Sequence, residues 1–389
     1  MEPDDHSPAP EPARTPDINS GDTLQWPDSA SSAPGSKPEG KLRRVFVGAQ
    51  GLRAGWSILL FAILLILFTF LTGSILAKVS HHDRKAGFTA VAAFLSELAP
   101  FLGMLGAAAI VAVLERRRIL DYNLVDVRGA LHFFSGLVAG FLALSALVGS
   151  LAAGGWLHFG PVALSGAAIV RFGALWAAAF LLVGCVEEGT FRCYLQFTLT
   201  RGINFWWALA ILGAVCTELL LRSKGNGVWG VYAVALIGLA PCLFLHLKRA
   251  PSAGFWQAAW VSSTLFGFVH TGNNGENWIG IFAAAAIGFV FCVSVRVTGS
   301  AWWAIGCHAA WDWSETYFYG TADSGFSAQG HLLTTAPSGN PLWSGGADGP
   351  EGSLLVLGVV AALLVALLLL YARSRPSVLA APVSAEPAQ

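Results

Sequence analysis

Three short stretches of an otherwise apolar chain carry acidic, basic and imidazole side chains at spacings that could support hydrolysis. The first is Glu187-Glu188-Gly189-Thr190-Phe191-Arg192, the second ends at His270, and the third runs from His308 to Asp312. An ionisable side chain inside a bilayer costs about 2.5–3.5 kcal/mol on insertion scales, so each of these groups requires an explanation. Such groups are by default functional, and the three stretches therefore indicate a site.

In the first stretch, helical spacing separates the two glutamates. Residues four apart share a helix face, so Glu188 and Arg192 are predicted to pair, whereas Glu187 points elsewhere without a local partner. The pair would hold the helix in place while Glu187 offers its carboxylate to a cavity. The same three residues could also form a buried polar network without any catalysis.

The two histidines supply side chains with tunable protonation. His270 closes the segment Phe266-Gly267-Phe268-Val269-His270, and alone it could equally cap a helix end. His308 and Asp312 lie four residues apart, so together they could orient an imidazole, bind a metal or stabilise an oxyanion. Peptide hydrolysis needs a carboxylate and a histidine to activate water, and donors to stabilise the tetrahedral intermediate. The three stretches contain all of these groups.

Other proteolytic signatures are missing from the sequence. It has no HExxH pattern, no Gly-Asp pair in an apolar run, and no Gly-x-Ser-x-Gly elbow in such a run. The six cysteines all fall in apolar segments without a CxxC pair, so no disulfide framework is implied.

The composition places these stretches in a membrane protein. Of the 389 residues, 55% are hydrophobic and only 12% are charged, about half the charged share of a soluble domain. Ten apolar runs are long enough to cross a bilayer. They are predicted over residues 55–77, 87–114, 129–157, 168–198, 204–222, 228–247, 253–271, 276–297, 299–318 and 353–372. The predicted fold is all-α, a polytopic transmembrane helical bundle of about ten spans.

The distribution of Lys and Arg between these spans predicts the orientation. Most basic residues fall in connections that lie on the same side as the N-terminus, whereas the connection 320–352 has none. The basic residues on the first side are Arg116, Arg117, Arg118, Arg128, Arg201, Lys248, Arg249, Arg296, Arg373 and Arg375. Two connections on the opposite side also contain basic residues, against this pattern. They are Lys78, Arg84 and Lys85 in one connection and Arg222 and Lys224 in the other. We therefore expect a multi-pass protein of a cell membrane, the bacterial inner membrane, with both termini cytoplasmic.

The segments outside the site differ in composition. Residues 1–40 are rich in Pro and Ser and carry eight acidic against two basic side chains, so we predict a disordered acidic tail. N-terminal transmembrane helices are expected over 41–164, a flexible non-cytoplasmic loop (a lid or a spacer) over 319–352, and a final transmembrane helix with a cytoplasmic tail over 353–389. No segment has the basic stripe of a nucleic-acid binder. The predicted partners are the lipid bilayer and a membrane-associated protein or peptide substrate.

In this order, the three stretches resemble the motifs EExxxR, FxxxH and HxxxN/D of the CPBP family of intramembrane endopeptidases. This family comprises the type II CAAX prenyl proteases, bacteriocin-processing enzymes and lysostaphin-resistance-like relatives. The flanking residues resemble the family too, in EEGTFRCYL from Glu187, STLFGFVH up to His270, and VTGSAWWAIGCHAAWDW around His308. The resemblance covers about residues 165–318, which we take as the catalytic membrane domain.

The resemblance implies that the chain is a CAAX-type intramembrane endopeptidase, a hydrolase in which Glu187 and His270 activate water. His308 and Asp312 would support the oxyanion or the geometry of the site. Glu188, Arg192 and Phe266 would have supporting roles. The family has been described both as glutamate-type without a cofactor and as metal-dependent. In the second case Glu187, His270 and His308 would hold a divalent metal such as zinc.

Two departures from the family pattern bear on this assignment. Asp312 stands where asparagine is common, and a carboxylate stabilises an oxyanion only when protonated or by orienting His308. Arg192 and Phe266 lie 74 residues apart, much farther than in other members. We interpret the excess, about residues 203–250, as an inserted helical hairpin that returns the chain to the same side.

Two other functions are also compatible with the sequence. The chain could be a non-catalytic membrane scaffold or bacteriocin-immunity protein, but the complete glutamate–histidine set favours an enzyme. It could also be a proton-coupled transporter, although it shows no internal repeat. The predicted spans also place His270 near the outer end of its helix and Glu187 towards the inner side. Either the span boundaries shift or the site lies in a tilted, broken region.

Overall fold

The computed structural model describes residues 45–48, 51–79, 89–222, 228–273, 275–323 and 328–371. The predicted acidic tail and the predicted cytoplasmic tail lie outside these residues. The described chain is mostly helical, with two short antiparallel strand pairs. These are β1 (Val47–Gly48) with β2 (Gly51–Leu52), and β3 (Leu157–Val162) with β4 (Leu333–Pro337). The all-α prediction is confirmed.

Eight helical segments of the described chain are long and apolar enough to cross a membrane. They are α2 (Ala54–Val79), α3 (Ala90–Glu115), α4 (Gly129–Ala153), α5–η2–α6 (Ala167–Glu188, Gly189–Leu195 and Gln196–Gly202), α7 (Phe205–Arg222), α8–η3–α9 (Val228–Ala233, Val234–Leu239 and Ala240–Leu247), α11 (Trp278–Thr298) and α14 (Leu354–Tyr371). The chain is therefore a polytopic, multi-pass membrane protein.

The other two predicted spans are also helical but are not among these eight. They are α10 (Ala253–His270), and α12 (Trp302–Trp313) continued by η4 (Ser314–Tyr319). Polar side chains lower the hydropathy of both segments, and they include the predicted site residues of the second and third motifs. The short elements η1 (Ile119–Asp121), α13 (Pro341–Ser344) and η5 (Pro350–Gly352) complete the described chain.

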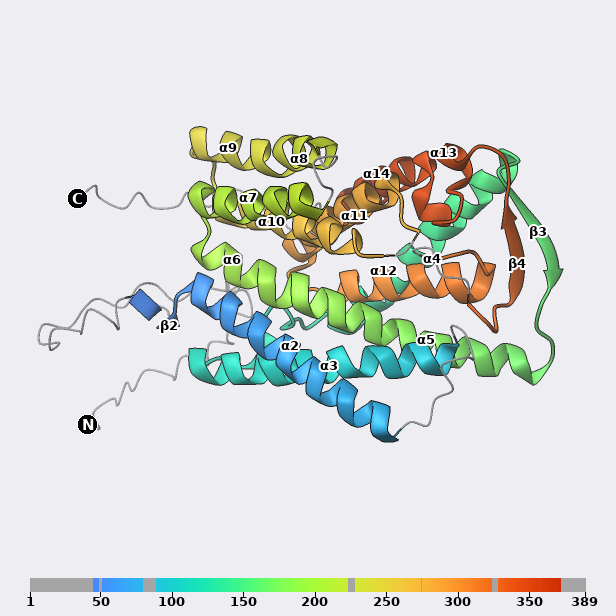
Figure 1. Cartoon of the computed structure of the whole chain (residues 1–389), viewed down its shortest axis with the longest axis horizontal. Helices are drawn as coiled ribbons and strands as arrows, with labels where there is room; N and C mark the ends of the chain where they lie inside the picture. Colours follow the sequence, from blue (N-terminus) through green and yellow to red (C-terminus); the bar gives the residue numbers. More distant parts are fainter. Residues whose placement is uncertain are drawn as a thin grey trace, which may run out of the picture.

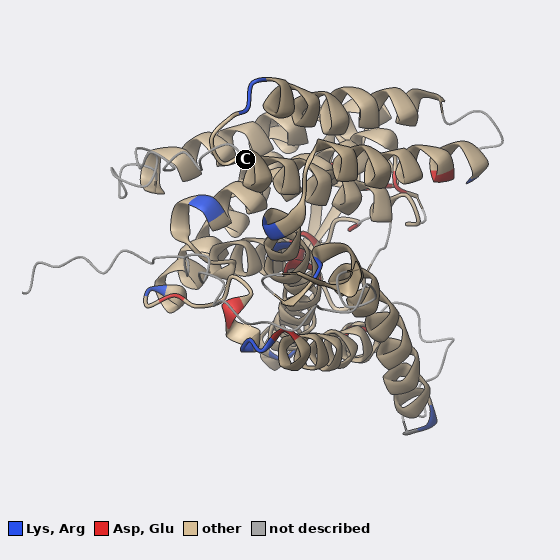
Figure 2. Ribbon diagram, turned by 90° about the vertical axis from the view of Figure 1, so that its left-hand side faces the viewer, with Lys and Arg blue, Asp and Glu red and all other residues tan. Residues whose placement is uncertain are grey.

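The helices run along the length of the bundle (Figure 1), and one of its ends carries several basic residues (Figure 2). Strands β3 and β4 lie at the right-hand end in Figure 1, and the ends of α6 and α9 lie at the left-hand end. Figure 2, which faces the left-hand end, shows Lys and Arg on several elements there. Arg117 and Arg201 both approach Glu115 at this end, with N···O distances of 3.5 and 3.0 Å. These basic residues belong to the connections that were predicted to lie on the same side as the N-terminus.

Helices α4 and α12 pack closely because glycines face each other across their contact. A Cβ atom at Gly136 or Gly140 would collide with the main-chain oxygens of Trp303 and Cys307, and one at Gly306 would collide with that of Phe133. Small residues at this i, i+4 spacing allow membrane helices to approach backbone to backbone. The contact fixes the position of α12, and α12 carries His308.

The helix that carries the two glutamates changes its winding directly after them. Segment η2 is a π-helix that begins at Gly189, and α5, η2 and α6 form one continuous segment of 36 residues. At 1.5 Å per residue this segment is about 54 Å long, which exceeds the roughly 30 Å thickness of the hydrocarbon core. Turns of π-helix are frequent at functional sites because they shift the register of the side chains that follow.

The conflict between the predicted depths of Glu187 and His270 disappears in the structure. The start of α10 meets the end of α6, where a Cβ on Gly254 would lie 3.1 Å from the Thr200 oxygen. Farther along, Ser262 donates a hydrogen bond to the Phe191 oxygen at 3.3 Å. The two helices are therefore antiparallel neighbours. Glu187 lies about 22 Å from the end of α6 and His270 about 26 Å from the start of α10, at 1.5 Å per residue. The predicted span boundaries caused the apparent mismatch.

Two other segments pack around this core. Helices α7 to α9, within the segment that we interpret as an insertion, pack on α10 through a cluster of apolar residues that includes Leu212, Val234 and Val261. The connection predicted as a flexible loop forms β4, α13 and η5 in its described part. It is tied to the first turn of α11, where the Asn277 N–H donates to Asp348 at 3.1 Å. The described part of this connection thus contributes to the wall around the site, through Asp323 and Glu351.

Candidate active site

A cavity of about 180 Å³ lies between α5, α10, α11, α12 and the connection that follows η4. All four predicted catalytic residues line it, Glu187 from α5, His270 from α10, and His308 and Asp312 from α12. Phe266, Phe291 and Trp311 contribute apolar surface to the same wall. The fold therefore brings together side chains that are up to 125 positions apart in the sequence.

Glu188 holds two other site residues in place. Its Oε1 atom accepts a hydrogen bond from Nη1 of Arg192 at 3.1 Å and one from Nδ1 of His308 at 2.8 Å. Both Glu188 and Arg192 are fully buried. The predicted pair within the first motif is present, and it also joins that motif to the third one. The link to His308 was not predicted.

Three aromatic rings surround the Arg192 guanidinium. Its central carbon lies 4.1 Å from the ring centre of Phe266, 5.2 Å from that of Phe291 and 5.8 Å from that of Phe191. Cation–π contacts of this kind are strongest where water is excluded. The guanidinium makes only one hydrogen bond to a described side chain, so these rings and Glu188 together balance its charge. Phe266 thus contributes through Arg192.

Glu187 differs from Glu188 in having no strong partner. Its closest ionic neighbour is His308, with Oε2 at 3.8 Å from Nε2, and this oxygen is buried without a hydrogen bond to any described residue. About a third of the side chain is exposed, compared with none of Glu188. A partly exposed carboxylate at the edge of a cavity can accept a proton from a water molecule there.

The ring of His270 is oriented by a main-chain oxygen. Its Nδ1 atom lies 2.7 Å from the carbonyl oxygen of Phe266. Because a carbonyl oxygen can only accept, Nδ1 carries the hydrogen, and the neutral ring keeps its lone pair on Nε2. Nε2 can therefore accept a proton or a hydrogen bond from water in the cavity.

His308 is placed between carboxylates. Its Nδ1 faces Glu188, and its Nε2 lies 3.5 Å from Oδ2 of Asp312 and 3.8 Å from Glu187. Phe291 stacks on the ring at a centroid distance of 5.7 Å. A histidine that can donate from both nitrogens suits these surroundings, since each donor then faces a negative oxygen. Such a ring can also donate to an oxyanion that forms in the cavity.

The predicted metal ligands do not meet at one point. Among the described residues, only one group brings three ligand atoms within 4.8 Å of one another, and it consists of Glu315, Asp323 and Glu351. Glu187, His270 and His308 are not such a group. Zinc ligands lie about 2.0–2.2 Å from the metal, which requires a closer arrangement. The predicted zinc set therefore does not fit this conformation.

Several acidic residues around the site are not among the residues predicted from the sequence. Asp323 and Glu351 line the cavity, and Glu315 lies beside them on η4. Glu97 on α3 lies near enough to Glu187 to interact with it electrostatically. Glu97 and Glu315 both fall inside predicted spans, so the rule that singled out Glu187 would have found them. Asp323 and Glu351 gave no such signal, because acidic residues are common in connections.

Comparisons with known proteins agree with the motifs. A family model described as type II CAAX prenyl endopeptidase, Rce1-like, matches residues 169–314. No curated protein and no solved structure matches the chain. The matched region holds all seven residues of the predicted site and confirms the family resemblance. It supports a hydrolase of the membrane-embedded CAAX protease type.

Proposed function

We propose that the chain is a glutamate-type intramembrane endopeptidase, with Glu187 as the base that activates water. One observation carries the proposal: Glu187, His270 and His308 reach a single cavity from three helices. The partly exposed carboxylate of Glu187 accepts the proton of a water molecule, and Nε2 of His270 orients that water through its lone pair. The activated water then attacks the carbonyl carbon of the scissile peptide bond. The C–N bond of the tetrahedral intermediate breaks, and protonated Glu187 returns its proton to the leaving amine.

His308 supplies the stabilising donor in this mechanism. Negative charge develops on the carbonyl oxygen during the attack, and a donor aimed at that position lowers the barrier. Glu188 fixes the ring by its 2.8 Å contact with Nδ1, which leaves Nε2 to serve the oxyanion. Asp312 acts through His308, because its carboxylate is 3.5 Å from Nε2 and an ionised carboxylate cannot itself donate. This assigns a positioning role to the residue that replaces the family's common asparagine.

The spacing of the ligand atoms supports water activation by Glu187 without a zinc ion. Hydrolysis should therefore survive a zinc-selective chelator. The scissile bond belongs to a membrane-associated protein or peptide, and the family that matches makes a prenylated C-terminal CAAX peptide the first substrate to test. We further propose that the basic end of the bundle and both termini lie in the cytoplasm, as the positive-inside rule predicts, and that the membrane is a bacterial inner membrane.

The proposal is tested with purified protein in liposomes and peptides that end in a CAAX sequence, with and without a prenylated cysteine. Mass spectrometry identifies the bond that is cut. We expect cleavage by wild type, by Glu218→Gln and in the presence of phenanthroline. Glu187→Gln, if it folds normally, should be inactive. Cleavage by Glu187→Gln at the wild-type rate would contradict the proposal. If no peptide is cut by any form, the scaffold alternative is favoured.

A further inference from the structure

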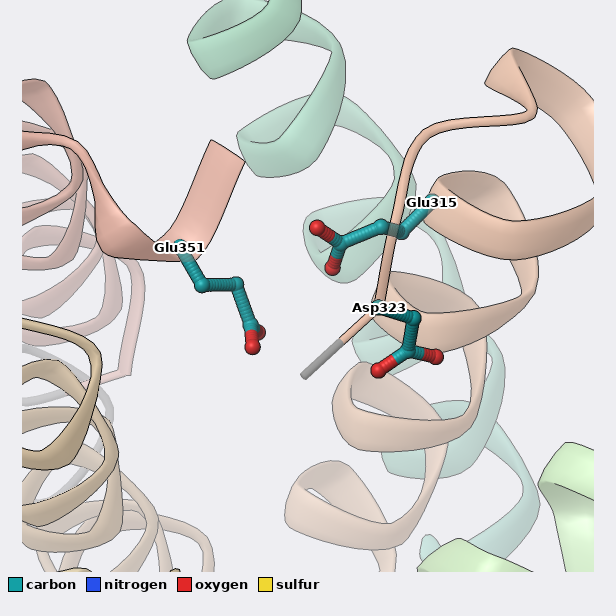
Figure 3. A group of neighbouring side chains, drawn as sticks. All are labelled: Glu315, Asp323 and Glu351. Atoms are coloured by element: carbon teal, nitrogen blue, oxygen red, sulfur yellow. The ribbon is translucent and has the colours of Figure 1, made fainter. Parts of the chain in front are cut away.

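Three carboxylates outside the proposed catalytic set converge at the edge of the cavity. Glu315 comes from η4, Asp323 from the connection that follows it, and Glu351 from η5. Figure 3 shows the side chains of Glu315 and Glu351 reaching towards the same space from opposite sides, with Asp323 next to it. One oxygen of each residue lies within 4.8 Å of the others. All three residues lie beyond the region that the family model matches.

The charge of this group is not balanced by protein side chains. Glu315 is completely buried, and neither of its carboxylate oxygens has a hydrogen-bond partner among the described residues. Asp323 accepts from the Thr316 hydroxyl at 2.7 Å, and Glu351 accepts from the Trp311 indole N–H at 2.7 Å. None of the three carboxylates forms an ion pair with a described Lys, Arg or His side chain. The connection 320–352 contains no Lys or Arg that could supply one.

Burying a carboxylate without a partner is strongly unfavourable, so this group requires protons or a bound cation. The free oxygens of Glu315 point into the space that Asp323 and Glu351 border, where a cation would be held from three sides. All three donors are carboxylate oxygens, which are the ligands of hard divalent cations rather than of zinc or copper. Oxygens on opposite sides of Ca²⁺ lie about 4.8 Å apart, twice a Ca–O distance of about 2.4 Å. The three oxygens all lie within 4.8 Å of one another, so a single Ca²⁺ ion can reach all of them.

We propose that Glu315, Asp323 and Glu351 form a calcium site at the edge of the catalytic cavity. Asp323 and Glu351 belong to the cavity wall, and Trp311 of α12 contacts Glu351. A bound ion would therefore tie the connection after η4 and η5 to the helix that carries His308. This role is structural and separate from water activation by Glu187. The proposal stands whether or not Glu187 is the base.

Terbium luminescence and thermal unfolding test the proposal on the full chain in detergent. Tb³⁺ occupies oxygen-rich calcium sites, and the Trp311 indole beside Glu351 is placed to sensitise its emission. We expect calcium to raise the unfolding midpoint and to displace Tb³⁺, at concentrations of about 10⁻⁴–10⁻³ M if the site resembles extracellular calcium modules. Trp311→Phe should lower the Tb³⁺ emission while calcium still raises the midpoint.

Isosteric variants locate the site. Glu315→Gln and Glu351→Gln each remove one charged ligand. Each should weaken calcium binding at least tenfold, or by about 1.4 kcal/mol. Both should be at least as stable as wild type without calcium, because the amide removes a buried charge. Glu218→Gln and Glu187→Gln should keep the full calcium response, and the second separates this site from the catalytic proposal. The absence of a calcium response in wild type, or an unchanged response in Glu315→Gln and Glu351→Gln, would overturn the inference.

Discussion

The Nδ1 atom of His308 lies 2.8 Å from Oε1 of Glu188, although the two residues are 120 positions apart. The same oxygen accepts the Arg192 guanidinium at 3.1 Å. Glu188 therefore joins α12 to the π-helical segment that follows α5, and it orients the histidine that faces the cavity. We infer that the second glutamate of the motif serves the geometry of the site and that the first one serves the chemistry.

Replacing Glu188 by glutamine should destabilise the protein strongly. Arg192 would keep its charge in a fully buried position without an ionic partner, and breaking a buried pair in this way costs about 3–5 kcal/mol. The matched control is Glu218→Gln, which breaks an exposed Glu218–Arg222 pair worth about 0–1 kcal/mol. Thermal unfolding in one detergent measures both. Equal midpoints for the two variants would contradict a structural role for Glu188.

The glycine contact between α4 and α12 should control activity from a distance. Gly140→Ala places a methyl group against the Cys307 oxygen, next to His308, and so displaces α12. Gly149→Ala is the control on the same helix, because a Cβ there meets nothing within 4 Å. We expect a lower unfolding midpoint and a loss of peptidase activity of at least about tenfold only for Gly140→Ala, since small displacements of catalytic groups reduce rates steeply. Similar activities in the two variants would show that this contact does not position His308.

His270 should contribute to the rate rather than to substrate affinity. His270→Gln removes the Nε2 lone pair that faces the water, and the loss of a general acid–base group lowers kcat by about 10²–10⁴ with little change in KM. His246→Gln serves as a control, because His246 stacks on Phe205 and does not line the cavity. Steady-state kinetics with the same peptide distinguish the two. A raised KM with an unchanged kcat for His270→Gln would assign this residue to substrate binding.

Stability should depend on pH through Asp348, which ties the connection 320–352 to α11. Burial raises the pKa of this carboxyl from 3.8 to about 7. A raised pKa means that the folded state prefers the protonated acid, so the stabilisation is full below pH 4 and is lost as the pH rises towards 7. Asp348→Asn should therefore unfold at a higher midpoint than wild type at pH 8 and at the same midpoint at pH 4, both without calcium. A constant difference between the two proteins over this range would contradict the linkage.

Local spacing in the sequence was sufficient for part of the site. Glu188 and Arg192 pair as an i, i+4 rule predicts, and His308 and Asp312 face each other for the same reason. The contact between His308 and Glu188 could not be predicted, because it depends on how α5 and α12 pack. The aromatic rings around Arg192 come from three different helices, and no local pattern indicates such a grouping.

The boundaries of the membrane spans could also be predicted only in part. Hydropathy found all ten helical segments, but α10 and the pair α12–η4 are less apolar than the other eight. Their boundaries were uncertain for that reason, and Glu187 and His270 were assigned to different depths. The carboxylates at the cavity edge were overlooked because two of them, Asp323 and Glu351, lie in a connection whose folding onto the site has no signature in the sequence.

The central claim is that the Glu187 carboxylate activates the attacking water. The most direct measurement compares single-turnover cleavage of one prenylated CAAX peptide by wild type, Glu187→Gln and Glu187→Asp in liposomes, with unfolding midpoints measured in parallel. We expect normal unfolding midpoints for all three proteins. The cleavage rate of Glu187→Gln should be at least about 10²-fold lower than that of wild type. Glu187→Asp should have an intermediate rate, because it keeps a carboxylate on a side chain that is shorter by one methylene group. Wild-type rates in the correctly folded Glu187→Gln variant would contradict the account.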